Sequence, residues 1–523
     1  MDNKEVVTRL AKPMKKGLLH LIFSRFFVVV LLLLLQVAIL LGAFLWLQEY
    51  VPWLAIVQGA FTIGMIIYLF NSEMDNSAKL TWMFLISIFP LPGSVFLYFT
   101  KMNFGHRASR QRVEELIEQT KTALPQDPAI LDRLEAGGSG MDDLRRYLNR
   151  SGCFPVYDDT DVTYFPSGEA KFEALLPALR AARESIFLEY FIIEEGFMWG
   201  SVLEILMEKA AAGVDVRVMY DGMCEMSQLP GDYAKRLEAH GIRAKAFAPI
   251  KPLISSHYNY RDHRKILVID GETAFTGGVN LADEYINRVE RFGHWKDTAV
   301  MLRGSAAKSF QLMFLQMWNI NEAEPVFDTW LEKPAAPAGT PSGYVMPYGD
   351  CPLDGEKVGE TVYIDILYRA TDYVHIMTPY LILDGEMETA LKYAAQRGVD
   401  VKLILPGIPD KKTAYALAKT HYRALLESGV QVFEYTPGFV HAKVCVSDEE
   451  KAVVGTINLD YRSLYHHFEC AAYLYQCACI QNIERDFLDT LAKCRPVTPE
   501  TIRATSLGYK LAGSLLKFIA PLM

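Results

Sequence analysis

Two stretches of the chain carry the same reactive side chains at the same spacing. Each stretch holds a His, a Lys and an Asp, followed by a Gly and an Asn: His263, Lys265, Asp270, Gly277 and Asn280, then His441, Lys443, Asp448, Gly455 and Asn458. A single His-x-Lys pair carries little information. Two copies with matched trailing residues indicate one catalytic centre assembled from two related halves.

This set of side chains suits a phosphodiester substrate. One imidazole can attack phosphorus while the other protonates the oxygen that leaves. The ammonium groups of Lys265 and Lys443 and the amides of Asn280 and Asn458 can hold the charged phosphoryl oxygens, a task that other enzymes give to Mg²⁺. We therefore expect a reaction that needs no metal and no cofactor.

The spacing also predicts how each motif folds. A His and a Lys two positions apart on a strand point to the same side. The residues after each Lys are apolar, as in a buried strand, and Asp270 and Asp448 follow where each strand ends. We count both Asp with the catalytic motif and expect them to bind backbone there. In the turns that follow, Gly278 and Thr456 are expected beside the substrate or its direct neighbours.

Each histidine also needs an acid that orients its ring. Asp297 begins the apolar run Thr-Ala-Val-Met-Leu, and Glu469 begins Cys-Ala-Ala-Tyr-Leu-Tyr. The alternative is a surface acid that caps a strand. Because the two acids occupy parallel places in the two copies, we expect them to hydrogen-bond the two histidines.

Beyond residue 150 the chain reads as one unit written twice. The sequences Ala-Ala-Ala-Gly-Val-Asp-Val at 210–216 and Ala-Ala-Gln-Arg-Gly-Val-Asp-Val at 394–401 each lie between a helical stretch and a β-like run. This alternation predicts an α/β fold with largely parallel strands. Two pseudo-symmetric repeats, 151–332 and 346–500, are expected to form one catalytic unit, joined by a linker rich in Pro and Ala, 333–345.

Three apolar runs open the chain, at 26–47, 51–70 and 80–98. Each approaches the roughly 20 residues that cross a bilayer as a helix, so 1–100 is expected to be a membrane segment with two to three transmembrane helices. A helical linker, 101–150, follows. The third run contains two prolines and is expected to kink or re-enter. Basic flanks and eight cysteines favour a multi-pass cell-membrane protein with a cytoplasmic catalytic region.

The overall charge argues against a nucleic-acid partner. The net charge is −9 and the pI is near 5.8, whereas proteins that bind nucleic acid usually present a basic face. The cysteines also lack the paired spacing of a zinc site.

The C-terminal stretch, 501–523, has apolar residues at helical spacing with lysines between them. This pattern predicts an amphipathic helix. Such a helix lies either on the membrane surface or against the catalytic core.

The duplicated motif resembles the signature of the phospholipase D superfamily, and its surroundings resemble those of the bacterial cardiolipin synthase family. These surroundings are Tyr-Arg-Asp before His263, Leu-Ala-Asp-Glu-Tyr after Asn280, His-Trp-Lys before Asp297, Thr378-Pro-Tyr380, Pro-Gly-Phe-Val before His441, and Leu-Asp-Tyr-Arg-Ser after Asn458. The resemblance covers nearly the whole chain, including the region of Pro90 and Pro92.

The resemblance implies a two-step transfer between lipids. One phosphatidylglycerol gives a phosphatidyl-histidine and free glycerol, and a second phosphatidylglycerol then takes the phosphatidyl group to form cardiolipin. The family pattern makes His263 the nucleophile and His441 the acid and then the base. The implied partners are phosphatidylglycerol, cardiolipin and the lipid membrane. One chain holds both halves, so a complete site requires no oligomer.

Two positions depart from the family pattern, because Asp262 and His467 stand where members often carry Asn. His467 is close to the expected site and puts the acceptor preference in question. Four other functions use the same fold or motif: a phospholipase D that uses water, a transferase that uses a different alcohol, a membrane-tethered nuclease and a non-catalytic scaffold. The acidic chain argues against the nuclease, and two complete motifs argue against the scaffold.

Overall fold

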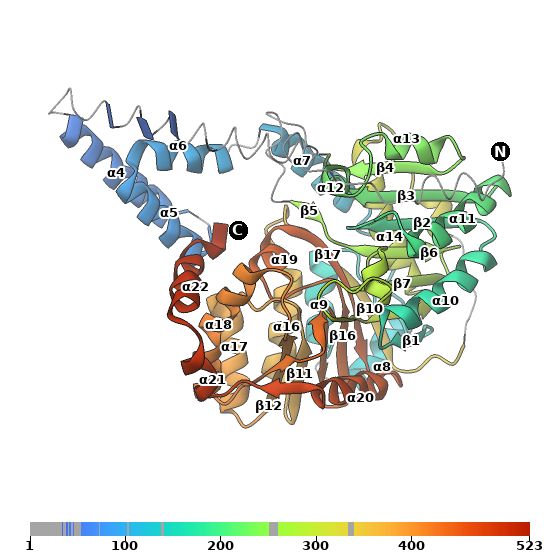
Figure 1. The fold of residues 1–523 in the computed structure, drawn as a ribbon. Helices are drawn as coiled ribbons and strands as arrows, with labels where there is room; N and C mark the ends of the chain where they lie inside the picture. The colour runs from blue at the N-terminus through green and yellow to red at the C-terminus, as the bar shows by residue number, and fades with distance from the viewer. Residues whose placement is uncertain are drawn as a thin grey trace.

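The computed structural model describes residues 54–72, 74–101, 104–136, 141–249, 260–332 and 339–522, with a few positions between 34 and 46. The two motifs lie in two sheets (Figure 1). The first sheet has the order β1-β9-β7-β6-β2-β3-β4. Its strands are β1 Asp161–Phe165, β2 Ser185–Tyr190, β3 Asp215–Asp221, β4 Arg243–Phe247, β6 Lys265–Ile269, β7 Thr273–Gly277 and β9 Ala299–Arg303.

The second sheet repeats this order as β10-β17-β16-β15-β11-β12-β13 and adds β18 at its edge. Its strands are β10 Tyr344–Asp350, β11 Tyr373–Met377, β12 Asp400–Pro406, β13 Gln431–Tyr435, β15 Val444–Ser447, β16 Lys451–Gly455, β17 His467–Tyr475 and β18 Cys494–Pro496. Each strand of the first sheet has a counterpart in the second. The structure thus confirms a mixed α/β fold made of two repeats.

Only part of each sheet is parallel. β2, β3 and β4 pair in parallel, as do β11, β12 and β13. The strands from β6 to β1, and their counterparts from β15 to β10, pair antiparallel. The prediction of largely parallel strands is therefore wrong. The linker from β6 to β7 is only Asp270 to Glu272, which permits a hairpin, whereas a parallel connection needs a helix-length crossover.

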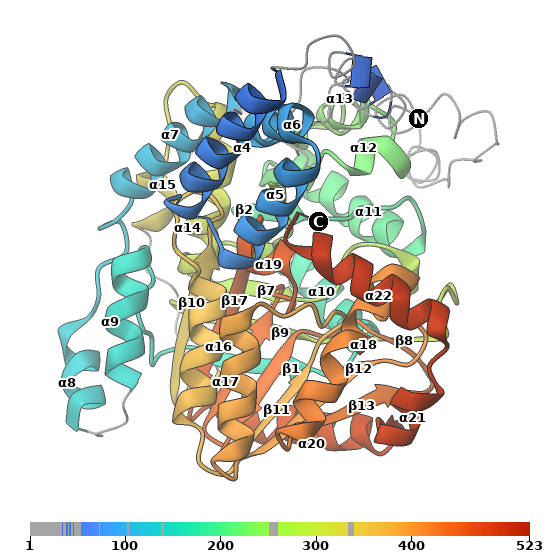
Figure 2. The same cartoon turned by 90° about the vertical axis from the view of Figure 1, so that its left-hand side faces the viewer.

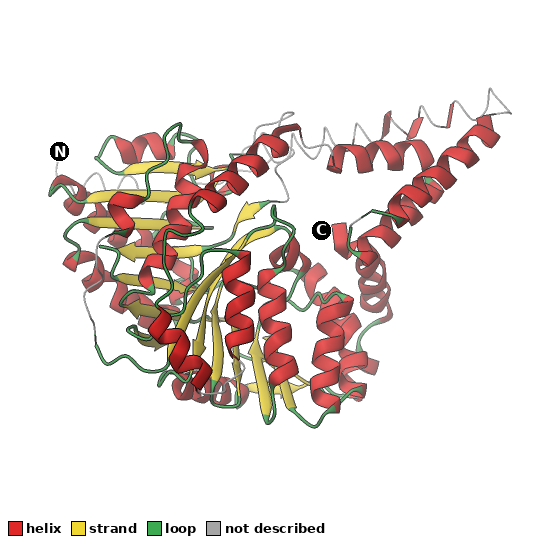
Figure 3. Cartoon of the chain, turned by 180° about the vertical axis from the view of Figure 1, so that it is seen from behind, coloured by secondary structure: helices red, strands yellow, loops and turns green. Residues whose placement is uncertain are grey.

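The two sheets face each other across a shared apolar core (Figure 3). Ile266 and Val268 of β6 and Val444 and Val446 of β15 belong to this one buried cluster. On the opposite face of β6, Leu267 joins a cluster with the outer helices. Because successive strand residues point to opposite faces, each motif strand is buried on both sides, and the layers are helix, sheet, sheet and helix.

Helices cover the outer face of each sheet. α10 Gly168–Ala181 and α11 Phe197–Ala211 cover the first sheet; α16 Val358–Arg369, α17 Gly385–Gln396 and α18 Lys412–Glu427 cover the second. α14 Ala307–Trp318 and α20 Ile480–Leu491 contribute to the shared core. Shorter helices fill connections: α12 Cys224–Ser227, α13 Tyr233–Glu238, η1 Asp283–Ile286, η2 Asn319–Asn321, α15 Asp328–Leu331 and α19 Tyr461–Tyr465.

The two halves also exchange short strands where the motifs begin. β5 Arg261–Asp262 leaves the first half and pairs in parallel with the start of β17. β14 Gly438–Val440 leaves the second half and pairs in parallel with β8 His294–Lys296. Each motif histidine follows directly after one of these exchanged strands. The strand pairing therefore fixes where each histidine lies relative to the other half.

The N-terminal helices project from the body of the molecule (Figures 1 and 3). These projecting helices are α4 Leu54–Phe70, α5 Asn76–Ile88 and α6 Pro90–Lys101. The next three helices, which connect them to the first sheet, are α7 Phe104–Gln119, α8 Pro128–Ala136 and α9 Met141–Ser151. α4, α5 and α6 pack around Leu69, Trp82, Ile86 and Leu97. The third apolar run is thus two helices, because α5 ends before Pro90, which suits the first turn of α6.

Among the described residues, no helix combines the length and the apolar character that a bilayer crossing requires. α4, which corresponds to the second run, has 17 residues. The first run, 26–47, lies outside the described residues apart from a few positions.

The C-terminal segment forms α21 Pro499–Ala504, α22 Leu507–Ile519 and η3 Ala520–Leu522. α22 lies along α18 and ends beside α5 (Figure 2). Gly513 permits the close approach, because a Cβ there would lie 2.5 Å from the Ala416 carbonyl oxygen. Thr81 of α5 donates a hydrogen bond to the Phe518 carbonyl at 2.7 Å. The predicted amphipathic helix thus packs on the core and contacts α5 of the N-terminal region.

Candidate active site

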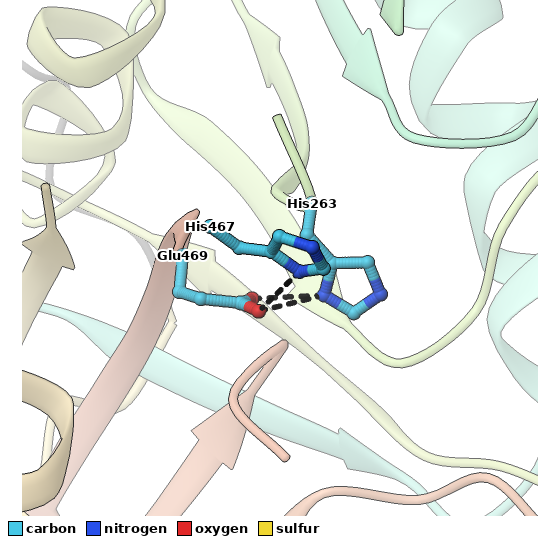
Figure 4. Close-up of side chains that lie close together, drawn as sticks. All are labelled: His263, His467 and Glu469. Atoms are coloured by element: carbon cyan, nitrogen blue, oxygen red, sulfur yellow. Dashed lines mark hydrogen bonds and ion pairs between the residues drawn. The ribbon is translucent and has the colours of Figure 1, made fainter. Parts of the chain in front are cut away.

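The structure pairs each motif histidine with an acid of the other half. His263 Nδ1 lies 2.9 and 3.0 Å from the two carboxylate oxygens of Glu469 (Figure 4). His441 Nδ1 lies 2.7 Å from Asp297 Oδ2. All four side chains are buried. Neither half alone can orient its own histidine in this way, so the site exists only when both halves are docked.

Backbone pairing holds both histidines in the same way. The His263 N–H donates to the Phe468 carbonyl at 3.0 Å, and the His441 N–H donates to the Lys296 carbonyl at 2.7 Å. In both cases the accepting carbonyl precedes the orienting acid by one residue. The parallel register of β5 with β17 and of β14 with β8 produces this match. Each His–acid pair is therefore set by strand register as well as by side-chain contact.

The two motif lysines lie beside the histidines. Lys265 Nζ donates to the His263 carbonyl at 2.6 Å, and Lys443 Nζ donates to the His441 carbonyl. Burial lowers the pKa of Lys265 to about 8 and that of Lys443 to about 7, although nearby carboxylates oppose the change. A buried ammonium without a full counter-charge favours an anionic ligand. The two lysines thus favour an anion at this site.

Burial also keeps both imidazoles neutral near pH 7. It lowers the pKa of His441 to about 4 and lowers the pKa of His263 well below its ordinary value, with the neighbouring lysines acting in the same direction. Burial by itself raises the pKa of Asp297 and Glu469, but the paired rings outweigh burial and hold both pKa values below the ordinary range. A neutral imidazole beside an ionised carboxylate is the form that acts as nucleophile or base.

The two motif asparagines are not equivalent. Asn280 Oδ1 accepts from the Ile192 N–H at 3.0 Å, and its Nδ2 donates to the Tyr285 hydroxyl at 2.8 Å. Asn458 Oδ1 is buried and has no hydrogen-bond partner among the described residues. The two halves therefore do not present two identical amides, as the repeated motif suggested.

Gly278 and Thr456 occupy corresponding positions beside the two acids. A Cβ at Gly278 would lie 2.0 Å from Asp297 Oδ1, so only glycine leaves room for that carboxylate. In the other half, the Thr456 hydroxyl donates to Glu469 Oε2. Both residues thus act through the orienting acids, one by leaving space and the other by adding a hydrogen bond.

Asp270 and Asp448 lie at the far end of the motif strands. Asp270 accepts from the N–H groups of Arg183, Glu184 and Ser185 at 2.8–2.9 Å, and Asp448 accepts from three N–H groups at the start of β11 at 2.9–3.0 Å. These carboxylates bind backbone and do not reach the histidines. They bind the beginning of β2 and of β11, the strands that pair with the motif strands β6 and β15.

One buried lysine near the site belongs to neither motif. Lys171 of α10 is fully buried, and its Nζ donates to the Tyr190 hydroxyl at 3.0 Å and to the Val279 carbonyl at 3.2 Å. Burial lowers the pKa of Lys171 to about 7. The bond to Val279 holds the turn that carries Asn280. In the sequence, Lys171 could be recognised only as a lysine within the apolar face of a predicted helix, because it belongs to no motif.

Comparisons with known proteins agree with this geometry. The family model described as "Cardiolipin synthase, PLD-like domain" matches residues 175–318 and 363–491. Cardiolipin synthase 2 of Bacillus anthracis is 32% identical over 474 residues, which cover 89% of this chain and 90% of that protein. Cardiolipin synthase of Halalkalibacterium halodurans is 31% identical over 484 residues, with 90% and 95% covered.

A protein of Streptococcus mutans that bears no functional name is 56% identical over 461 residues, which cover 88% of this chain and 100% of that protein. Among solved structures, the crystal structure of phosphatidylserine synthase from Haemophilus influenzae Rd KW20 has a TM-score of 0.53 at 14% identity, covering 68% of this chain and 95% of that chain. That likeness concerns the fold alone.

We expect Gly278→Ala to displace Asp297 and so to release the ring of His441. Overpacking of this kind costs about 1–3 kcal/mol of unfolding free energy, and loss of ring orientation should remove most phosphodiester turnover. Thermal melting and turnover measure the two effects. Thr456→Ser is the matched control, because it retains the hydroxyl that binds Glu469 and should stay active. Full turnover by Gly278→Ala would show that Asp297 is not needed in its present place.

Proposed function

The chain belongs to the cardiolipin synthase family of phospholipase D-like proteins, and we propose that it transfers a phosphatidyl group from one phosphatidylglycerol to another, giving cardiolipin and glycerol. The observation that carries this proposal is the pair of buried His–acid contacts across the two halves, with a lysine beside each. Two such units at one site supply a nucleophile, an acid and two cations for a phosphodiester.

In the first step, His263 attacks phosphorus. Glu469 holds the Nδ1–H of this ring, so Nε2 carries the lone pair that forms the P–N bond. The bond from phosphorus to the glycerol oxygen breaks, and His441 supplies the proton for that oxygen. The bound phosphate anion raises the pKa of His441 and favours its charged form.

In the second step, a hydroxyl of another phosphatidylglycerol gives its proton to His441 and attacks phosphorus. The P–N bond breaks and His263 returns to its neutral form. Lys265 and Lys443 hold the non-bridging oxygens in both steps, where negative charge accumulates. Water in place of the second lipid gives phosphatidic acid from the same intermediate, so the acceptor alone separates a synthase from a phospholipase D.

A second observation supports membrane attachment. We propose that α4 to α6 and α22 contact the lipid surface, because both carry large apolar side chains in solvent. Ile56 and Phe70 of α4 are 79% and 73% exposed, and Leu507, Leu511 and Leu515 of α22 are 82%, 61% and 64% exposed. Exposed apolar residues gathered on one region mark an interaction surface. The multi-pass topology and the cytoplasmic side of the site stay predictions.

We expect purified protein with labelled phosphatidylglycerol to form cardiolipin and glycerol in step. His263→Ala should abolish both products because no covalent intermediate forms. His441→Ala should slow the reaction by about 10²–10⁴-fold through loss of general acid–base catalysis. Thin-layer separation of labelled products measures both. Phosphatidic acid without cardiolipin would instead identify a hydrolase that uses the same residues.

The pH dependence of kcat/KM should show an alkaline limb near pH 7–8, far below the ordinary lysine range. Lys443 and Lys265, with pKa values of about 7 and 8, lose their protons as pH rises through these values, and the phosphate then loses its cations. Activity should also fall at acidic pH, well below the ordinary histidine range, where His263 becomes protonated in the free enzyme and loses the lone pair that attacks phosphorus. In Lys443→Arg, the group at position 443 stays charged, so the alkaline limb should move upward. A rate that stays constant to pH 10 would contradict the role of both lysines.

A fluorophore on Leu515→Cys should report lipid contact in reconstituted vesicles. We expect a blue shift of emission and quenching by a lipid-borne quencher, because Leu515 faces outward on α22. Leu488→Cys on α20, where the leucine is 47% exposed, is the matched control and should show neither effect. Equal responses at the two positions would exclude a specific membrane role for α22.

A further inference from the structure

Three electron-pair donors converge beside His263. They are a ring nitrogen of His263, a ring nitrogen of His467 and a carboxylate oxygen of Glu469, all within 4.8 Å of one another (Figure 4). His263 Nδ1 lies 2.9 Å from Glu469 Oε1, and His467 Nδ1 lies 3.6 Å from the same oxygen. The three side chains are buried. Two come from β17 and the third follows the exchanged strand β5, so docking of the halves creates the cluster.

His467 lacks the hydrogen bonds that a buried imidazole needs. It is 7% exposed, and neither ring nitrogen has a hydrogen-bond partner in the part of the chain that the structure describes. A buried polar group without a partner costs about 1–3 kcal/mol, and an ion or water that completes its hydrogen bonds is one physical explanation for it. The ring is held in place by aromatic neighbours, with centroids 5.3 Å from His263 and 6.4 Å from Phe191.

The other half provides an internal comparison. The register that pairs His467 with Arg261 pairs Trp295 with Phe439, so Trp295 is the counterpart of His467. Its ring lies 5.4 Å from His441. An indole donates a hydrogen bond but does not bind a metal. Around His441 and Asp297, the third donor position is therefore filled by a side chain that cannot ligate.

The donor set selects a cation of a particular kind. Two imidazole nitrogens and one carboxylate oxygen suit Zn²⁺ and similar transition metals, whereas Mg²⁺ and Ca²⁺ prefer oxygen ligands. Ligands at 2.0–2.2 Å from a tetrahedral ion lie roughly 3.3–3.6 Å apart. His467 Nδ1, at 3.6 Å from Glu469 Oε1, falls in this range, and His263 Nδ1, at 2.9 Å from the same oxygen, is closer than the range. The Glu469 carboxylate, which faces both rings, disfavours an anion at the same point.

We propose that His263, His467 and Glu469 form a binding site for a divalent transition metal of the Zn²⁺ type, and that the bound ion inhibits the enzyme. The ion takes the place of the Nδ1 proton of His263, which is released to solvent. It also removes the Glu469 hydrogen bond that orients this ring. The ammonium of Lys265, which lies at the His263 carbonyl, opposes a dication and weakens its binding. Metal binding is independent of the proposed function, whereas inhibition rests on it.

Cobalt(II) in place of zinc gives a direct test with the full chain in detergent. We expect the wild-type protein to develop the visible absorption of a Co²⁺ site with nitrogen ligands. His467→Gln and His263→Gln should lose this absorption. His441→Gln and His466→Gln should keep it, since neither residue belongs to the cluster. His263→Gln and His441→Gln both remove a proposed catalytic histidine, so a difference between them reports metal binding and not catalysis.

Zinc inhibition of cardiolipin formation is the second arm. Zn²⁺ should inhibit the wild type reversibly, with recovery on addition of EDTA, while Mg²⁺ has no such effect. His467→Gln should raise the half-inhibitory Zn²⁺ concentration about tenfold or more, relative to its own rate without metal. His466→Gln should retain the wild-type value.

Three results would overturn the proposal. They are a Co²⁺ spectrum unchanged in His467→Gln, an equal loss of the spectrum in His441→Gln, and binding of inorganic phosphate instead of Co²⁺ that depends on His467. Thermal melting of each variant separates loss of a ligand from loss of the fold. If the wild type forms no cardiolipin but still binds Co²⁺ through His467, the proposed function fails and the metal site stands.

Discussion

The contact of each motif histidine with the acid of the other half is the constraint on which the rest of this structure depends. A buried ionised carboxylate requires a partner, because alone it carries a large desolvation cost. Glu469 and Asp297 are fully buried, and each finds its partner across the interface. The exchanged strands β5 and β14 satisfy this constraint by bringing each histidine into the backbone register of the opposite half. Folding of either half is therefore completed by docking to the other.

Burial that protects these pairs also prepares the site chemically. The same exclusion of water that keeps the imidazoles neutral lowers the pKa of both lysines toward neutrality. A site of this kind gains most from an anionic ligand, which restores the charge on the lysines and completes the missing interactions. The geometry thus favours binding of a phosphodiester without any ion to neutralise it.

A symmetric scaffold here carries an asymmetric site. In the two repeats, Gly278 occupies the position that corresponds to Thr456, and Trp295 occupies the position that corresponds to His467. These exchanges lie beside the histidines and not in them, so the two rings keep the same anchoring but have different neighbours. The two rings therefore differ in their surroundings, as the proposed division of roles between nucleophile and acid–base requires.

The sequence by itself determined the chemistry and the repeat. Identical spacing of His, Lys, Asp and Asn needs no coordinates to indicate a two-part site, and the apolar run after each Lys predicts a strand buried on both faces, as Leu267 and Val268 show. Asp297 and Glu469 were also identified from their parallel positions before apolar runs. These signals are local, and local pattern is what a single sequence records.

The pairing of each acid with its histidine, Glu469 with His263 and Asp297 with His441, is seen only in the tertiary structure. The paired residues are 206 and 144 positions apart, and their contact follows from strand exchange between the halves. The mixed direction of the sheets, the split of the third apolar run at Pro90 and the inequality of Asn280 and Asn458 have the same origin. Each depends on how distant elements pack, and side-chain periodicity does not encode that packing.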